Sequence, residues 1–185
     1  TGAFCILSYY LLAVYVMHDV RIFYCLVLGL LTALAVTLLV QYYTGITLRP
    51  VKEIARGGVR GVATNLIYGF AWGMESAVAL KILVAVVNII AFYLMGGGLA
   101  GVLGITAATL GISVMKGIIM AADAFGPIAD NASGIAEMAG LGPQVRHAGD
   151  ALDAAGNITK AITKGYSMSA ALMSSVVILF AYLLS

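Results

Sequence analysis

Residues 22–40 read IFYCLVLGLLTALAVTLLV, an apolar run without a single charged side chain. A helix needs about 20 mostly apolar residues to cross the roughly 30 Å of hydrocarbon in a bilayer, and this run approaches that length. The whole chain has the same character, since 62% of its 185 residues are hydrophobic and only 10% are charged. Soluble domains carry about a quarter charged residues. The sequence therefore predicts an all-α fold, a polytopic transmembrane helical bundle.

Apolar segments of this kind recur along the chain and are separated by more polar connections. We expect five transmembrane helices, at about residues 4–17, 20–44, 64–95, 99–125 and 157–185. The chain begins and ends in apolar runs, as expected for part of a longer protein. Two longer polar loops are expected at residues 45–63 and 126–156. The first holds Arg49, Lys52, Arg56 and Arg60, and the second holds Arg146, with Lys160 and Lys164 just inside the helix that follows. The positive-inside rule places both loops in the cytoplasm, so we expect a multi-pass protein, most simply of a bacterial inner membrane.

Charge and cysteine content exclude other classes of function. A net charge of +2 is too small to indicate a nucleic-acid-binding protein. Cys5 and Cys25 both lie in apolar runs, where cysteine is typically a small buried hydrophobe rather than half of a disulfide or a metal ligand.

The second long loop and its flanks carry the most informative pattern. Asp123, Asp130 and Glu137 follow one another at intervals of seven, which places them along one stripe of a helix. After a short turn at residues 140–143, a second stripe follows at spacings of three and four, formed by Asp150, Asp153, Asn157, Lys160 and Lys164. Two helices joined by such a turn can lay these stripes against each other.

The residue types in the two stripes suit a metal-bound anion. Carboxylate and amide oxygens are ligands that Mg²⁺ prefers, and Mg²⁺ can bridge to phosphate oxygens. Lysine side chains supply positive point charges for the same anion. The alternative is a solvated helical hairpin whose charged residues form ordinary surface pairs, and spacing alone does not decide between the two.

Two strings within this region resemble the membrane-integral pyrophosphatases. Residues 123–138 read DAFGPIADNASGIAEM, and residues 150–160 read DALDAAGNITK. The upstream strings QYYT (41–44) and ATNLIYG (63–69) also look like landmarks of that family. This chain departs from the family pattern at Ser133, Ile158 and Gln41, where glycine, threonine and an acidic residue are usual.

The resemblance implies a fold of sixteen transmembrane helices in a homodimer, with a funnel open to the cytoplasm, of which this chain supplies five. The implied activity is hydrolysis of Mg²⁺-bound pyrophosphate coupled to outward movement of H⁺. At the matching positions, the implied Mg²⁺ ligands are Asp130 and Asn157. The residues implied to bind substrate or line the polar funnel are Asp123, Asn131, Glu137, Asp153 and Lys164. The carboxylates that activate water are expected on helices outside this chain, so these five helices are not expected to catalyse the reaction alone.

Lys160 and Thr163 carry a further implication of the resemblance. Family members that need K⁺ tend to have alanine and glycine at these positions, whereas K⁺-independent proton pumps have lysine and threonine. A tethered ammonium can occupy the space of K⁺ and supply its charge. The alternatives are simpler: Lys160 is an interfacial lysine, Asn157 caps the helix that begins there, and Asp123 pairs with Lys116.

Two other functions compete with a pyrophosphate-driven pump. One is a secondary transporter or channel segment that binds an ion between its polar helices without hydrolysis. The other is a catalytically inactive relative, suggested by Ser133, Ile158 and Gln41. For the pump, the expected partners are pyrophosphate, Mg²⁺, protons, membrane lipid and a second copy of the chain, with no nucleic acid.

Overall fold

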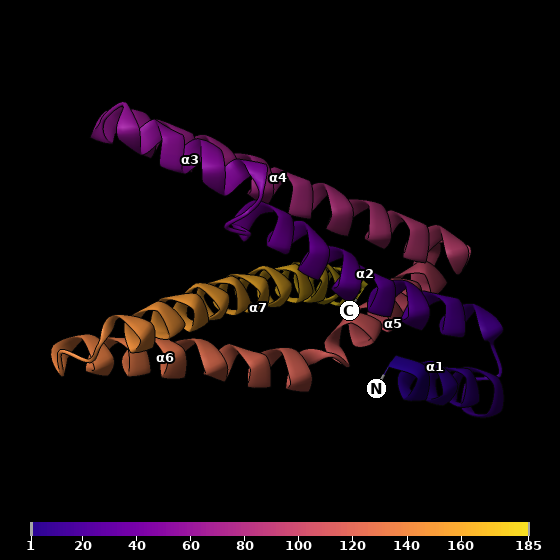
Figure 1. The fold of residues 1–185 in the computed structure, drawn as a ribbon. Coiled ribbons are helices and arrows are strands. Elements are labelled where there is room, and N and C mark those ends of the chain that lie inside the picture. Colours follow the sequence, from indigo (N-terminus) through magenta and orange to yellow (C-terminus); the bar gives the residue numbers. More distant parts are fainter. Residues whose placement is uncertain (1, 185) are drawn as a thin grey trace. The chain divides into compact units, whose positions relative to one another are not determined.

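The computed structural model describes residues 2–184, and all regular elements in that range are helices (Figure 1). They follow in the order α1 (Gly2–Leu11), the π-helical turn η1 (Leu12–Val16), α2 (Val20–Thr44), α3 (Arg49–Val59), α4 (Val62–Leu94), α5 (Gly98–Ser113), α6 (Lys116–Met138) and α7 (Pro143–Leu184).

Length and composition allow three of these helical segments to cross a membrane, or four if a bent pair forms one span. The three are Val20–Val59, Val62–Leu94 and Pro143–Leu183, and the bent pair is α5 with α6, at an angle of 42°. The Gly2–Val16 segment is apolar but shorter than a span. The transmembrane helical bundle predicted from composition is confirmed, and the expected number of five crossings stays a prediction.

Both expected loops are largely helical: residues 126–156 form the helical hairpin that the two polar stripes predict, whereas the helix within residues 45–63 is not predicted by the sequence pattern. Within residues 45–63, Pro50 lies in the first turn of α3, where its fixed φ and missing N–H favour a helix start. Within residues 126–156, only residues 139–142 separate α6 from α7, and Gly140 in that turn has a φ of +65°. The last helix accordingly begins at Pro143 and not near residue 157.

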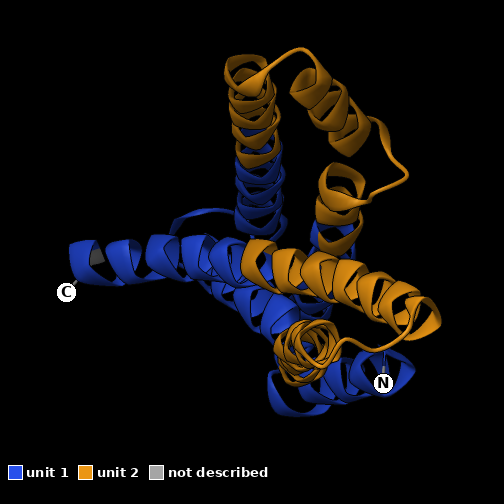
Figure 2. Ribbon diagram, turned by 60° about the vertical axis from the view of Figure 1, so that its left-hand side comes forward, with its two compact units in different colours: residues 1–36, 78–116, 166–185 blue, residues 37–77, 117–165 orange. Residues whose placement is uncertain are grey.

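The chain divides into two compact units (Figure 2), which we describe separately: residues 1–36, 78–116 and 166–185, and residues 37–77 and 117–165. In the first unit, glycines bring α2 against α5. A Cβ on Gly29 would overlap the carbonyl of Ala108, and a Cβ on Gly111 would overlap the carbonyl of Leu26. Small residues at crossings are the usual means of close packing between membrane helices.

Tyrosine hydroxyls add polar contacts to this unit. The Tyr9 hydroxyl donates a hydrogen bond to the Gly111 carbonyl at 3.2 Å, and that of Tyr166, a fully buried side chain, donates to the Ile112 carbonyl. Each hydroxyl therefore has an acceptor within the bundle, which avoids an unpaired polar group in an apolar setting.

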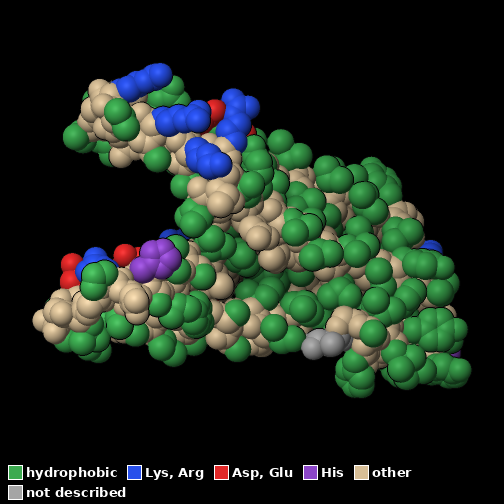
Figure 3. All heavy atoms as spheres, viewed as in Figure 1, with side chains coloured by type: hydrophobic (Ala, Val, Ile, Leu, Met, Phe, Trp, Pro, Cys, Tyr) green, Lys and Arg blue, Asp and Glu red, His purple; other side chains and the backbone are tan. Residues whose placement is uncertain are grey.

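The second unit contains two antiparallel helical hairpins. In one, α3 folds back along the beginning of α4, and in the other, α6 lies along the first part of α7 (Figure 1). Charged side chains gather over α3 and over the turn between α6 and α7, whereas most of the remaining visible surface is hydrophobic (Figure 3). The second hairpin carries the residues that the sequence singles out.

Candidate functional site on the α6–α7 hairpin

Two glycines set the closest approach between α6 and α7. A Cβ on Gly156 would lie 2.9 Å from the Cα of Gly126, and a Cβ on Gly126 would lie 2.6 Å from Cε of Lys160. Both glycines are buried. The two helices can therefore cross with almost no side chain between them, and the aliphatic part of Lys160 passes over the space that Gly126 leaves open.

This crossing places the ammonium group of Lys160 between two predicted metal ligands. Its Nζ lies 3.4 Å from Oδ2 of Asp130 and 3.3 Å from Oδ1 of Asn157. The Lys160 side chain is about one-third exposed, at 32%, and that of Asp130 is 65% exposed. The predicted metal ligands thus lie together, on either side of one positive charge, and an incoming anion can reach them from solvent.

Asp153 extends this network along α7. The amide Nδ2 of Asn157 donates to Oδ2 of Asp153 at 3.1 Å, whereas Oδ1 of Asp153 is buried and has no hydrogen-bond partner in the described part of the chain. Buried carboxylate oxygens normally have a partner. The unpaired oxygen is therefore a free acceptor beside the Lys160 cluster, available to a cation or a donor.

The alternative role of Asn157 as a helix N-cap is wrong. Asn157 lies in the interior of α7, and its side chain contacts Asp153 and Lys160. The helix continues through Gly156 because a single glycine costs only about 1 kcal/mol relative to alanine, and alanines at 151, 154 and 155 favour a helix here.

Thr163 links the two helices one turn beyond Lys160. Its side chain is buried, with 5% exposure, and its hydroxyl donates to the carbonyl of Ile119 on α6 at 3.3 Å. Residues three apart on a helix face the same side, so Lys160 and Thr163 both face α6. The lysine contributes charge and the threonine contributes an interhelical hydrogen bond.

Other predicted residues lie outside this cluster. Glu137 forms an ion pair of 2.9 Å with Arg146, which also pairs with Asp150 at 3.1 Å. These side chains belong to the end of the hairpin near the turn. Among the residues that the structure describes, three predicted site residues make no hydrogen bond or ion pair: Asp123, Asn131 and Lys164. The alternative pairing of Asp123 with Lys116 is therefore not formed.

Sequence reasoning missed the bridging role of Arg146 and the contact between Gly126 and Gly156. The spacing of Arg146 and Asp150, four residues apart, is a signal for a helical ion pair. The two glycines lie at nearly equal distances from the turn at residues 139–142. In an antiparallel hairpin, such positions face each other, so the sequence held this signal as well.

The residues of this chain can supply some of the ligands of a magnesium site, but not a complete set. Asp130 and Asp153 supply carboxylate oxygens and Asn157 an amide oxygen, which are hard ligands suited to Mg²⁺. Within residues 2–184, however, no group of three or more acidic, histidine or cysteine side chains could hold a metal ion. This chain can contribute ligands, and the remainder would have to come from substrate, water or other helices.

Comparison with known proteins supports the resemblance across the whole chain. The family described as inorganic H⁺ pyrophosphatase matches residues 1–185. A "K(+)-insensitive pyrophosphate-energized proton pump" of Methanosarcina mazei is 36% identical over 180 residues, which cover 96% of this chain and 27% of that protein.

Two further relatives differ in their stated response to K⁺. The "K(+)-insensitive pyrophosphate-energized proton pump 2" of Moorella thermoacetica is 42% identical over 161 residues, covering 85% of this chain and 24% of that protein. A "Putative K(+)-stimulated pyrophosphate-energized sodium pump" of Bacteroides thetaiotaomicron is 40% identical over 163 residues, covering 85% of this chain and 22% of that protein. The chain spans about a quarter of the length of these curated relatives.

The family match covers every residue, and the strings around Asp130 and Asn157 that carry the resemblance lie in the hairpin whose side chains converge on Lys160. This chain belongs to the inorganic H⁺ pyrophosphatase family.

Proposed function

We propose that the protein to which this chain belongs hydrolyses Mg²⁺-bound pyrophosphate at the cytoplasmic face of a membrane and uses the reaction to move H⁺ outward, without a need for K⁺. The observation that carries this proposal is the position of the Lys160 ammonium between Asp130 and Asn157. It places a permanent positive charge among the oxygen atoms that would hold a metal-bound phosphate.

The residues of the hairpin have separate tasks in this proposal. Asp130 and Asn157 would hold Mg²⁺, with Asp153 beside them, and the metal would offset the negative charge of the phosphoryl oxygens. Lys160 neutralises Asp130 and holds this carboxylate of α6 beside the amide of Asn157 on α7. The interhelical bond of Thr163 keeps α6 and α7 in register, so that these groups remain pre-positioned for the substrate.

Independence from K⁺ follows from the covalent attachment of the Lys160 charge. A potassium ion must be recruited from solution, whereas the ammonium of Lys160 is always present within 3.3–3.4 Å of the two oxygen atoms. Overall identity does not distinguish the two types, because the relatives named K⁺-insensitive and K⁺-stimulated are 42% and 40% identical to this chain. The proposal therefore depends on residues 160 and 163.

The remaining parts of the proposal concern the surroundings of the site. The hairpin α3–α4 with its basic residues and the hairpin α6–α7 would face the cytoplasm of a bacterial inner membrane, by the positive-inside rule. Groups that activate water would lie on other helices of the longer protein, so that this chain alone has no hydrolytic activity. The assembly would be a homodimer in contact with lipid.

Membranes that contain the full-length protein provide the test. We expect them to release phosphate from pyrophosphate with Mg²⁺ present, to stop when Mg²⁺ is chelated, and to acidify the compartment opposite the site. Adding K⁺ should leave the rate unchanged. Ion movement without phosphate release would indicate a transporter, and the absence of both activities in folded protein would indicate an inactive relative.

A further inference from the structure

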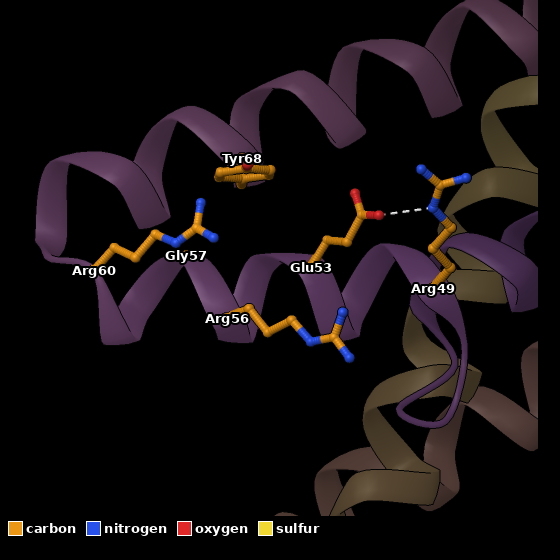
Figure 4. Close-up of a pocket in the computed structure, with 6 residues that line it drawn as sticks. All are labelled: Arg49, Glu53, Arg56, Gly57, Arg60 and Tyr68. Carbon is orange, nitrogen blue, oxygen red and sulfur yellow. Dashed lines mark hydrogen bonds and ion pairs between the residues drawn. The ribbon is translucent and has the colours of Figure 1, made fainter.

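A second polar site lies between α3 and the beginning of α4, on the other hairpin of the same unit. A cavity of about 360 Å³ is lined there by Arg49, Glu53, Arg56, Gly57, Arg60 and Tyr68 (Figure 4). Sites for small ligands typically begin at about 300 Å³. The predicted pyrophosphate site uses none of these residues.

Gly57 creates the close approach that closes one wall of the cavity. A Cβ at this position would lie 3.1 Å from Cδ2 of Tyr68 and 3.4 Å from the Cα of Asn65. Gly57 is buried in an otherwise exposed part of α3. The helix backbone therefore packs directly beside the Tyr68 ring, and the longer side chains of α3 surround the remaining space.

One arginine of the cavity is already neutralised. Nε of Arg49 lies 2.7 Å from Oε1 of Glu53, and its guanidinium also lies 5.9 Å from the centre of the Trp72 ring. In Figure 4, Glu53 and Arg49 extend toward α4, joined by the dashed line. This pair leaves no net charge.

The other two arginines carry the positive charge of the cavity. Figure 4 shows the guanidinium of Arg60 in the space between α3 and α4, near Tyr68, and that of Arg56 along the outer side of α3. Within residues 2–184, Arg56 and Arg60 form no hydrogen bond or ion pair. The lining therefore has three guanidinium groups against one carboxylate, Glu53, whose charge also acts on Arg56.

We propose that this cavity binds a phosphate-type oxyanion, with Arg60 as the principal ligand, Arg56 as a second positive charge and the Tyr68 hydroxyl as a further donor. Guanidinium groups bind phosphate oxygens through two parallel hydrogen bonds, and the net positive charge of the lining suits a phosphate-type anion. The same chemistry is offered by the headgroup of an anionic lipid and by free phosphate. Basic side chains recur along α3 and its C-terminal end at spacings of three and four, which is also typical of helices that contact anionic headgroups.

The experiment uses full-length protein in EDTA, because the arginine cavity needs no metal whereas the proposed pyrophosphate site does. In one arm, purified protein is equilibrated with mixed phosphatidylglycerol and phosphatidylcholine, and the retained phosphatidylglycerol is quantified. In the other, binding of radiolabelled inorganic phosphate is measured in pure phosphatidylcholine nanodiscs. Arg60→Ala should weaken binding in one arm by at least about tenfold, the loss expected for one charge-assisted contact, and Arg56→Ala/Arg60→Ala should weaken it further.

Lys52→Ala is the matched control, because it removes a positive charge from the same helix at an exposed position outside the cavity. If Arg60→Ala weakens the binding of phosphatidylglycerol and Lys52→Ala does not, the ligand is a lipid. If Arg60→Ala instead weakens the binding of inorganic phosphate, the ligand is soluble. Equal losses in Lys52→Ala, or unchanged binding in both arms, would overturn the proposal. If Arg60→Ala does not fold, Arg60→Gln and Arg60→Lys replace it, and only the lysine variant should retain binding.

Discussion

The ammonium nitrogen of Lys160 lies 3.4 Å from Oδ2 of Asp130, although the two residues are 30 positions apart and belong to different helices. The contact requires a continuous α7, a tight turn at residues 139–142 and an unobstructed crossing at Gly126. The contact therefore forms only when all three features of the hairpin are present.

Lys160→Ala should make hydrolysis of pyrophosphate respond to K⁺. The substitution removes the tethered charge beside Asp130 and Asn157 and leaves space that a potassium ion can occupy. We expect a lower rate without K⁺ and recovery as K⁺ is added, measured as phosphate release by membranes with the full-length protein. The parent and Lys52→Ala should show flat K⁺ titrations, and a flat titration for Lys160→Ala would contradict the K⁺-surrogate role.

Gly126→Ala should reduce activity more than an alanine elsewhere on α6. The new methyl group would lie 2.6 Å from Cε of Lys160 and 2.9 Å from the Gly156 carbonyl oxygen, so both the lysine and the partner helix must shift. We expect at least about a tenfold lower rate of hydrolysis, equivalent to roughly 1.4 kcal/mol.

Gly134→Ala is the control on the same helix, because a Cβ there meets nothing within 4 Å. It should retain the parent rate and gain up to about 1 kcal/mol of stability from improved helix propensity. Similar activities for the two alanine variants would show that the crossing tolerates a methyl group.

Gly29→Ala should destabilise the first unit. Its Cβ would overlap the carbonyl of Ala108, which is backbone and has no rotamer to change, so α2 and α5 must separate. Overpacking of this kind costs about 1–3 kcal/mol. Thermal unfolding in detergent should show a lower Tm than for Gly69→Ala, whose Cβ meets nothing within 4 Å.

The ion pairs near the turn of the α6–α7 hairpin should contribute little to activity. Arg146 joins Glu137 and Asp150, but all three side chains are largely exposed, at 43%, 61% and 59%. Solvent screens such pairs. Glu137→Gln should therefore keep the parent rate of hydrolysis, whereas Asp130→Asn should abolish most of it. A loss in Glu137→Gln as large as in Asp130→Asn would show that the whole acidic stripe binds substrate.

Acid should weaken one contact on the first unit. Arg21 donates hydrogen bonds to Asp19, and this holds the pKa of the Asp19 carboxyl below its ordinary value of 3.8. A lowered folded-state pKa contributes stability that is fully present above the ordinary pKa and is lost as the pH falls through the lowered pKa. The Tm difference between the parent and Asp19→Asn should therefore be constant near neutral pH and shrink below pH 3.8. A difference that grows in acid would contradict this account.

The sequence was sufficient for the class of fold, because the absence of charge in segments such as residues 22–40 leaves few alternatives to a membrane helix. It was also sufficient for the pairing of the two polar stripes, since spacings of seven and of three and four place side chains on one helical face. The helix within residues 45–63 is not predicted, because its polar residues resemble those of a loop. A helix outside the hydrocarbon can be polar, and Pro50 marks a helix start as readily as a break.

Contacts between backbones that lie far apart in the sequence leave no pattern in the sequence itself. The close approach of Gly29 to Ala108 depends on the relative rotation of two helices whose apolar sequences carry almost no directional signal. Asn157 was ambiguous for a related reason: the dipeptide Gly156-Asn157 suits a helix start, and only the contacts of its side chain with Asp153 and Lys160 show a position inside α7.

The hydrogen atom that Gly126 carries in place of a side chain also couples two positions on different helices. The aliphatic part of Lys160 passes over Gly126, and its amine contacts Asp130. A side chain added at position 126 would therefore press first on the lysine, and its effect would be felt at the amine.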